Sequence, residues 1–310
     1  MDATTKIKST YSEREARMDS LCSSWGLDRL HDLMGRYNPS KKELTELRFA
    51  VMLYISKAFY FDFTQDEEEF LRRLNDSKNV NDNVTPNGAI VPKKEYQLEL
   101  NMVLRAWTRI LKGMVKDKSL INAYNICPNI RIKFSEEVDE NKDRTLNTAW
   151  PHSDAWLAGP WGINCHTPLF GDIDNNNLKF WKPIDKNKFT DEWIKTSKTY
   201  EEMQWVLDYY IADDSMLPKK GHVHLSDYAL IHGTWRRPNA GTRVSMDTTI
   251  FAGTNRVETH EERAEEYLQD MKVVGEDMFI STNRSLTEDI IKKKSNFAHY
   301  ASGTLQLTNL

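Results

Sequence analysis

The first part of the chain, from about residue 10 to residue 115, carries apolar residues at helical spacing. In two stripes an apolar side chain recurs every three or four residues: Leu44, Leu47, Val51, Tyr54 and Ala58, then Leu100, Val103, Trp107, Leu111 and Met114. Stripes of this kind are typical of buried helix faces. We therefore predict an N-terminal helical region over residues 1–128 that packs on a separate core.

Capping residues and a long loop divide this helical region. Ser12 with Glu15 matches a capping box, in which a hydroxyl and a carboxylate satisfy backbone N–H groups at a helix start. Ser40 with Glu43 matches the same motif. Residues 74–94 are polar and rich in turn formers. A surface loop is the simpler interpretation of this segment, and a lid over a site is the alternative.

From about residue 129 the pattern changes to short β-like runs separated by Gly, Asn, Asp and Pro. These runs are 129–134, 161–164, 178–183, 222–225, 228–233 and 243–251. Many short strands with turn signals between them are typical of a sandwich or a jelly roll. A helical pattern at 199–211, opening on Thr199 with Glu202, predicts an insertion near residues 190–212.

The predicted organisation therefore has three parts. The helical region over 1–128 comes first, a β-rich core over 129–252 follows, and a tail over 253–310 comes last. Helical patterns near 259–272 and 286–294 predict that the tail is helical.

Composition narrows the class of protein. With 310 residues and 39% hydrophobic content the chain can build one substantial core. The net charge of −4 and the lack of a basic face argue against nucleic acid as a partner. The longest strongly apolar run, 49–55, is too short to cross a bilayer. We expect a small-molecule substrate and no membrane, and a homo-oligomer is left open.

The cysteines and the N-terminus indicate a cellular compartment. Cys22, Cys127 and Cys165 are odd in number and far apart, so they predict neither a disulfide framework nor a zinc knuckle. The first residues lack the apolar stretch of a signal peptide. A reducing, cytoplasmic location is therefore expected.

The stretch TAWPHSDAW at 148–156 contains the main candidate for chemistry. His152 and Asp154 stand two residues apart, so in extended backbone they project to one side and can hold a metal ion together. His232, which ends an apolar run just before Gly233, is the best-placed third ligand. Two imidazoles and a carboxylate leave three positions open, as Fe(II) needs when it binds a cosubstrate and O₂. A structural zinc site would instead be closed by four ligands.

A second motif follows in the last predicted core strand. Arg243 and Ser245 alternate with apolar residues, so both point to the same side of the strand. An arginine fork grips a carboxylate with two bonds, and a serine hydroxyl can add a third. A buried arginine needs an anionic partner, because an unpaired interior charge is costly. A dicarboxylate cosubstrate would supply that partner.

Together, His-Ser-Asp at 152–154, His-Gly at 232–233 and Arg-Val-Ser at 243–245 resemble the motifs of Fe(II)/2-oxoglutarate-dependent oxygenases. The resemblance spans residues 129–252 and implies a mainly β fold with helices, a double-stranded β-helix of the jelly-roll or cupin type. It implies His152, Asp154 and His232 as iron ligands, with 2-oxoglutarate and O₂ as cosubstrates. It also implies that Arg243 and Ser245 bind the distal carboxylate of 2-oxoglutarate. The layout is similar as well to an oxygenase branch associated with bacterial carbohydrate-biosynthesis clusters.

In related enzymes that halogenate, a small residue replaces the carboxylate ligand. The carboxylate of Asp154 therefore predicts hydroxylation or another oxidation rather than chlorination. Desaturation, ring closure and epimerisation are open outcomes of the same chemistry.

Other residues near the motifs have two interpretations each. Asn164 and Thr167 are expected to contact cosubstrate or to be ordinary strand polars. Arg131 is expected to bind an acidic group of the substrate or to close a surface ion pair. Three tryptophans are expected to form a pocket wall, with core packing as the alternative: Trp150, Trp156 and Trp161. His166 is not assigned to the site, and His222 and His224 are expected to be structural or to face the substrate. Arg236 and Arg237 are expected in a solvated loop, with contact to an anionic substrate as the alternative.

We expect an oxygenase that hydroxylates an unactivated C–H bond of a small polar substrate, a sugar or an amino-acid derivative, and releases succinate and CO₂. One alternative is a catalytically silent jelly-roll binding module, in which the three candidate ligands would be scattered. Another is a cupin-type metalloenzyme that uses His222 and His224 and no 2-oxoglutarate. Neither alternative needs Arg243 buried behind a metal.

Overall fold

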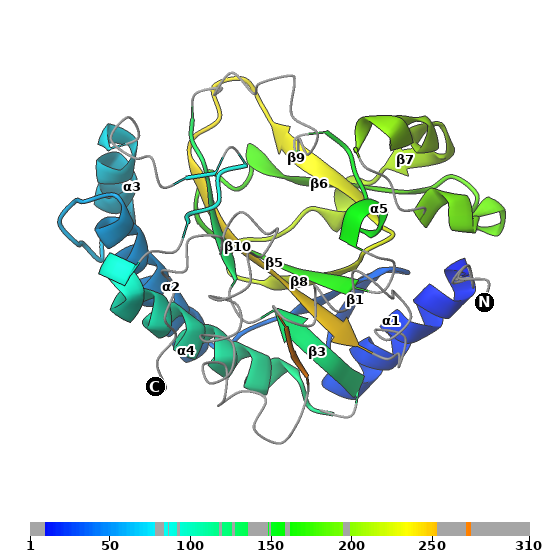
Figure 1. Ribbon diagram of the computed structural model, residues 1–310, viewed down its shortest axis with the longest axis horizontal. Helices are drawn as coiled ribbons and strands as arrows, with labels where there is room; N and C mark the ends of the chain where they lie inside the picture. Colours follow the sequence, from blue (N-terminus) through cyan, green and yellow to red (C-terminus); the bar gives the residue numbers. More distant parts are fainter. Residues whose placement is uncertain are drawn as a thin grey trace, which may run out of the picture.

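The computed structural model describes residues 10–77, 84–85, 87–91, 94–117, 120–125, 128–135, 148, 150–158, 162–194, 199–252 and 271–273. Two antiparallel sheets and a set of helices make up this part of the chain (Figure 1). The mainly β architecture with helices agrees with the prediction. The full winding of a double-stranded β-helix stays a prediction.

Four longer helices come from the predicted helical region: α1 (Tyr11–Trp25), α2 (Lys41–Ala58), α3 (Glu67–Asp76) and α4 (Gln97–Met114). The capping box of α2, Ser40 with Glu43, is confirmed. The box predicted for α1 is wrong, because Thr10 and Glu13 form it. Ser12 already lies inside the first turn, whereas Thr10 has the extended backbone that a cap requires.

The large sheet has the order β1-β2-β8-β5-β10-β3-β11, and β4 also pairs with β10. Its strands are β1 (Asp28–His31), β2 (Met34–Tyr37), β3 (Ile121–Asn125), β4 (Asn129–Lys133), β5 (Gly162–Gly171), β8 (Val223–Asp227), β10 (Arg243–Ala252) and β11 (Met271–Val273). The hairpin β1–β2 and the strand β3 lie inside the region that was predicted to be helical. The N-terminal part of the chain therefore contributes strands to this sheet as well as helices.

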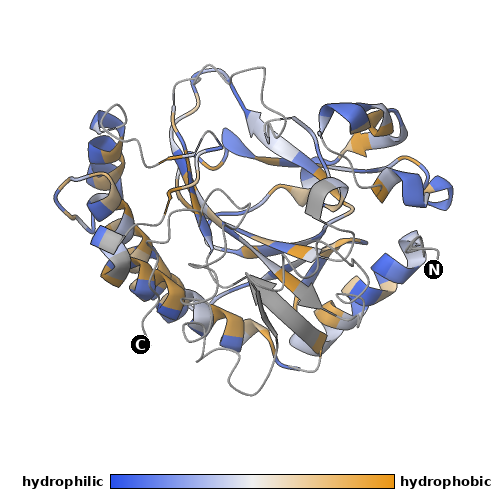
Figure 2. Ribbon diagram, in the orientation of Figure 1, coloured by the Kyte–Doolittle hydropathy of each residue, from blue (hydrophilic) through white to orange (hydrophobic). Residues whose placement is uncertain are grey.

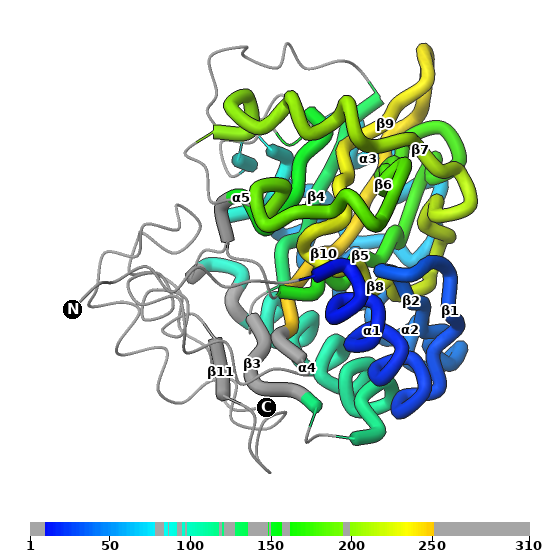
Figure 3. The backbone as a smooth tube through the Cα atoms, turned by 90° about the vertical axis from the view of Figure 1, so that its right-hand side faces the viewer, coloured from blue at the N-terminus to red at the C-terminus, as the bar shows by residue number. Residues whose placement is uncertain are grey.

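The small sheet has the order β7-β6-β9, with β6 at Asn176–Pro183, β7 at Tyr210–Ala212 and β9 at Ile231–Arg236. In Figures 1 and 3 it lies above β5 and β8 of the large sheet. Short helical turns complete the described chain: η2 (Lys94–Tyr96), α5 (Ala155–Ala158), η4 (Lys186–Lys188), η5 (Asp191–Ile194), η6 (Glu201–Tyr209) and η7 (Asp214–Met216). The helix predicted over 199–211 is thus a 3₁₀ helix that ends in strand β7.

The two faces of the large sheet differ in chemistry. Alternate residues of β10, Val244, Met246 and Ile250, are fully buried in one apolar core with side chains of α2 and α4. Both helices carry hydrophobic and hydrophilic residues along their length in Figure 2, as helices with one buried face do. The intervening residues of β10 are polar, and two of them, Arg243 and Ser245, are buried. We call the first face the apolar face and the second the polar face.

Two predicted segments are described only in part. Within loop 74–94, Val84 pairs with Ile90, and Ala89 pairs with Arg131 on β4. The described part of this loop therefore lies along β4. Of the tail helix predicted at 259–272, the last two residues belong to strand β11 instead, and the rest lies outside the described residues, as does 286–294.

Candidate active site

The three predicted metal ligands come together at the edge of the small sheet. His152 lies in an extended segment before α5 and pairs with His232 on β9. The His152 N–H donates to the His232 carbonyl at 2.7 Å, and the His232 N–H donates to the His152 carbonyl at 2.8 Å. This two-bond bridge fixes the two imidazoles side by side, with ring centroids 4.4 Å apart.

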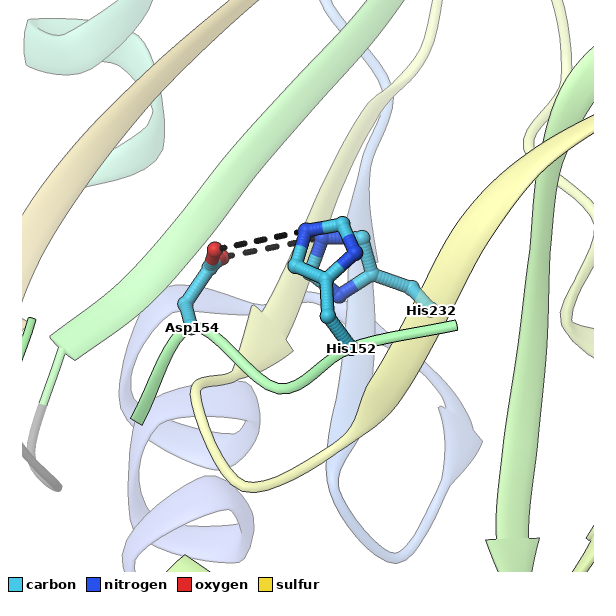
Figure 4. A group of neighbouring side chains, drawn as sticks. All are labelled: His152, Asp154 and His232. Carbon is cyan, nitrogen blue, oxygen red and sulfur yellow. Dashed lines mark ion pairs between the residues drawn. The ribbon is translucent and has the colours of Figure 1, made fainter. Parts of the chain in front are cut away.

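Asp154 faces both imidazoles (Figure 4). Its Oδ2 lies 3.7 Å from His232 Nε2, and its Oδ1 lies 3.9 Å from His152 Nε2. One ligand atom from each of the three side chains lies within 4.8 Å of the others. In the described part of the chain, no other three His, Cys, Asp or Glu side chains meet this criterion.

Hydrogen bonds set the tautomer of each imidazole. His152 Nδ1 lies 2.7 Å from the Trp150 carbonyl, and His232 Nδ1 lies 3.3 Å from the Leu230 carbonyl. A carbonyl only accepts, so each Nδ1 carries the proton and each Nε2 lone pair is directed toward Asp154. Tyr200 stacks on the His152 ring at 4.3 Å and helps to hold its orientation. Oriented imidazoles of this kind are typical of metal ligands.

Burial disfavours the charged form of these side chains, which suits metal binding by the imidazole of His152 but opposes it for the carboxylate of Asp154. Burial, with the neighbouring His232, lowers the pKa of His152 well below its ordinary value, so that the ring is neutral. Burial also raises the pKa of Asp154. Asn164 on β5 donates from Nδ2 to Asp154 Oδ2 at 3.2 Å and fixes the carboxylate. Two neutral imidazoles and an oriented carboxylate form a donor set that suits Fe(II).

Arg243 and Ser245 lie on the polar face of β10, as predicted. Arg243 is 1% exposed and Ser245 is fully buried. Among the described residues, Arg243 Nε, Arg243 Nη1 and Ser245 Oγ have no hydrogen-bond partner. Burial, together with the nearby charges of Arg131 and Arg236, lowers the pKa of Arg243 to about 9. A buried cation with free donors is the environment that an anionic ligand would complete.

His166 was set aside in the sequence, but the structure brings it to the same face. It lies on β5 opposite Asp247 of β10, two residues from Asn164. The side chain is buried, and its Nε2 has no partner in the part of the chain that the structure describes. Its alternation with Asn164 along β5 is the signal that could have identified it.

Arg131 on β4 pairs with Asp247 through Nε and Nη2. Asn129 donates to the same carboxylate at 2.9 Å. Burial alone would lower the pKa of Arg131, but the charge of Asp247 raises it. The side chain is 22% exposed and close enough to Asp154 to sense its charge. Arg131 thus forms an ion pair, and its contact with a substrate stays a prediction.

Thr167 is not brought to the site by the strand register. It lies opposite Met246 of β10, whose side chain belongs to the apolar face, whereas His166 lies on the polar face. Its hydroxyl is buried without a partner among the described residues. The predicted contact of Thr167 with a cosubstrate therefore has no support from its position.

The predicted tryptophan wall is divided. Trp156 is fully buried in a cluster with Trp193 and Tyr200, and its Nε1 donates to the Trp193 carbonyl at 2.8 Å. Trp150 is 41% exposed next to His152. Trp161 lies outside the described residues. Trp150 is the one of the three whose described position offers a surface to a substrate.

The alternative metal pair, His222 and His224, is engaged elsewhere. His222 Nδ1 is hydrogen-bonded to Asn38 Oδ1. His224 Nε2 accepts from the Lys219 N–H at 3.2 Å, and burial lowers the pKa of His224 to about 3. Neither ring belongs to a group of three potential metal ligands among the described residues. This geometry does not favour a cupin-type metal site on β8.

Comparisons with known proteins give only distant structural similarities. No protein-family profile matches the sequence, and no curated protein is significantly similar to it. The non-heme alpha ketoglutarate dependent epimerase SnoN from nogalamycin biosynthesis aligns over 82% of this chain and 88% of its own, with 10% identity and a TM-score of 0.41. The carbocyclase SnoK from the same biosynthesis aligns over 79% of this chain and 86% of its own, with 8% identity and a TM-score of 0.37. An N-substituted L-amino acid dioxygenase from Burkholderia ambifaria aligns over 70% of this chain and 81% of its own, with 11% identity and a TM-score of 0.35.

The three candidate ligands of the motif resemblance, His152, Asp154 and His232, converge in space. None of the described helices is long and apolar enough to cross a membrane.

Proposed function

We propose that the protein is an Fe(II)/2-oxoglutarate-dependent oxygenase that hydroxylates an unactivated C–H bond of a small polar substrate. The observation that carries the proposal is a pair of complementary features. His152, Asp154 and His232 converge at one point, and the buried Arg243 has donors without a partner among the described residues on the polar face of β10. The first feature suits a divalent iron, and the second suits an acidic cosubstrate.

The residues present fit both groups. His152 Nε2, His232 Nε2 and one oxygen of Asp154 would hold the iron, and Asn164 would keep the carboxylate in place. When bound, the iron supplies the oxidative chemistry that converts 2-oxoglutarate, O₂ and a C–H bond to succinate, CO₂ and an alcohol. Three ligands leave room for a chelating cosubstrate and O₂.

The protein itself contributes binding, orientation and exclusion of water. Arg243 and Ser245 would bind the far carboxylate of 2-oxoglutarate and so direct its keto-acid end toward the metal. Tyr200 and the Trp150 carbonyl keep the His152 ring in the ligand orientation. The buried positions of His152, His232 and Arg243 limit access of bulk water to the reaction.

The substrate would meet the exposed side of this site. Trp150, beside His152, offers an apolar plate on which a sugar ring can stack. Arg131, partly exposed and close to Asp154, offers a cation to an acidic group. These features support a small polar substrate such as a sugar or an amino-acid derivative. They support hydroxylation as the default outcome and do not select it over desaturation, ring closure or epimerisation.

The two alternatives are less consistent with the geometry. A silent binding module predicts scattered ligands, whereas the three side chains converge. A cupin-type enzyme without 2-oxoglutarate leaves the buried Arg243 without a function.

Arg243→Ala tests the proposal. Under anaerobic conditions, iron-loaded wild-type protein should develop a metal-to-ligand charge-transfer band on addition of 2-oxoglutarate and should form succinate when air is admitted. Arg243→Ala should still bind Co(II) but should lose both the band and the succinate. Arg237→Ala, on the exposed loop after β9, is the matched control and should behave as wild type. Succinate formation that survives Arg243→Ala, or no metal binding by the wild type, would overturn the proposal.

A further inference from the structure

Three buried side chains on neighbouring strands end in polar atoms that have no partner. They are His166 on β5, which is 3% exposed, and Arg243 and Ser245 on β10. Among the described residues, His166 Nε2, Arg243 Nε, Arg243 Nη1 and Ser245 Oγ accept or donate no hydrogen bond. Buried polar groups in folded proteins are nearly always paired, so such a group of orphans requires an explanation.

The strand register places the three side chains on one face. Asp247 lies opposite His166, and Ser245 lies opposite Pro168, so His166 and Ser245 are diagonal neighbours across the β5–β10 pair. Arg243 and Ser245 are two residues apart and share that face. The charge of Arg243 also acts on the His166 ring. The orphaned atoms therefore face a common region.

We propose that His166 is a third anchor of the cosubstrate and donates its Nε2–H to the distal carboxylate beside Arg243 and Ser245. This role rests on the proposed function and extends it to a residue outside the recognised motifs. A carboxylate has two oxygens with about four lone-pair positions. Ser245 Oγ, His166 Nε2 and one of the two orphaned N–H groups of Arg243 supply three donors, which one carboxylate can accept together.

His166 differs from the other buried histidine on this face at its Nε2. His224 accepts a backbone N–H through its Nε2, although its Nδ1 also has no partner among the described residues. His166 Nε2 has no such contact. Thr167, the next residue, also has an orphaned hydroxyl, but its register places it on the apolar face.

The ionisation of His166 is compatible with this role. Burial, and then the charge of Arg243, lowers the pKa of His166 well below the ordinary value of 6.5. The ring is therefore neutral at physiological pH and carries one N–H, which the Nε2 tautomer directs to the carboxylate. Binding then adds no second positive charge beside Arg243.

The proposal predicts a change in cosubstrate selectivity as well as in affinity. His166→Phe keeps the ring volume and removes the donor, so the Kd for 2-oxoglutarate should rise about 10- to 100-fold, as for loss of a hydrogen bond to a charged group. The Kd for 2-oxobutyrate, which lacks the distal carboxylate, should change by less than about 3-fold. His166→Gln keeps an N–H donor and should recover most of the affinity for 2-oxoglutarate.

Calorimetry on Mn(II)-loaded protein without O₂ measures these constants independently of turnover. His222→Phe, whose ring is bonded to Asn38 on another strand pair, is the matched control. The Mn(II) affinity of each variant reports whether the site is intact. If His166→Phe does not fold, the His166 Nε2 proton signal of ¹⁵N-histidine-labelled wild type, recorded with and without 2-oxoglutarate, provides the second test.

The outcomes separate the two proposals. Selective loss of 2-oxoglutarate binding in His166→Phe, with rescue by Gln or a shifted Nε2 signal, supports the anchor. The role of His166 is overturned if His166→Phe leaves the 2-oxoglutarate affinity unchanged, if it weakens both keto acids equally, or if the Nε2 signal does not shift. In that case, loss of 2-oxoglutarate binding in Arg243→Ala would still leave the proposed function in place. A wild type that binds metal but no 2-oxoglutarate overturns both.

Discussion

The two faces of the large sheet are built from alternate residues of the same strands, yet they follow opposite rules. On the apolar face, Val244, Met246 and Ile250 join the helices in a core with no charged members. On the polar face, Arg243 and Ser245 are as deeply buried but lack partners among the described residues. The apolar face therefore stabilises the fold, and the polar face carries hydrogen-bonding groups that the described residues do not satisfy.

A second buried charge cluster sharpens the contrast. Asp227, at the end of β8, forms ion pairs with Arg14 and Arg17 of α1, and all three side chains are almost completely buried. This carboxylate is matched by cations, whereas Arg243 forms no ion pair with a carboxylate of the described residues. The difference fits a structural role for Arg14 and Arg17 and the proposed ligand-binding role for Arg243.

The largest effect is expected at the metal ligands. Asp154→Ala should abolish Fe(II) or Co(II) binding and succinate formation, because it removes the one anionic ligand. The melting temperature of the metal-free protein should not fall, since burial raises the pKa of Asp154 and disfavours its charge in the folded state. Asp208→Ala, at an exposed position of η6, is the control. Retained metal affinity in Asp154→Ala would remove this residue from the ligand set.

Asp227→Asn should destabilise the fold by about 3–5 kcal/mol, because it leaves two buried arginines without their anion. Burial opposes ionisation of Asp227, but Arg14 and Arg17 hold its pKa below the ordinary value of 3.8. The carboxylate therefore contributes stability above about pH 4, and that stability is lost as the pH falls toward the lower pKa of the folded state.

Urea unfolding at several pH values measures this contribution. Wild type should lose stability below about pH 4, and Asp227→Asn should lose less over the same range. Asp214→Asn, which removes an exposed carboxylate near Lys179, should cost almost nothing. Equal costs for the two variants would contradict the role of the buried cluster.

Neighbouring residues of β10 offer the most direct comparison of the two faces. Met246→Ala should cost about 2–5 kcal/mol of folding free energy, because it opens a cavity in the apolar core. Ser245→Ala removes an orphaned hydroxyl, so it should leave stability unchanged within about 1 kcal/mol and should weaken 2-oxoglutarate binding. Chemical denaturation and calorimetry together check both effects. A Ser245→Ala cost as large as that of Met246→Ala would show that both faces are structural.

The smallest effect is expected at Asn164. It contacts the metal group only through Asp154, so Asn164→Ala should weaken metal binding by about 10-fold, the lower end of the effect of outer-shell partners. Asn187→Ala, on an exposed turn, should have no effect. Competition with a metal indicator measures the difference. An effect as large as that of Asp154→Ala would mean that Asn164 is itself a ligand.

The residues that share a strand were the easiest to predict. The pairing of Arg243 with Ser245 needed only the alternation of β structure, and the start of β10 was predicted correctly. The convergence of His152 and His232 followed from the motif resemblance, and their backbone bridge explains it physically.

Positions that depend on contacts between strands were not predicted. His166 and Thr167 are adjacent, and their opposite faces follow from the pairing of β5 with β10 across an irregular register near Ser245. A shift of one residue in this pairing would exchange the two faces of β5. The local sequence shows that His166 and Asn164 share a face, but it does not show which face of the sheet that is. The hairpin β1–β2 was missed for a similar reason, because its strands have four residues each and depend on pairing with β8.

The strands from the first 128 residues have a consequence for how this protein can be divided. Strand β2 covers the edge of β8, and β3 covers part of β10. A fragment that starts at residue 129 would contain every motif of the site but would expose long unpaired strand edges, which promote association with other chains. The N-terminal region and the strands that carry the candidate site are thus expected to be inherited, exchanged and engineered as one unit. Transplanting residues 129–252 alone should yield an aggregate.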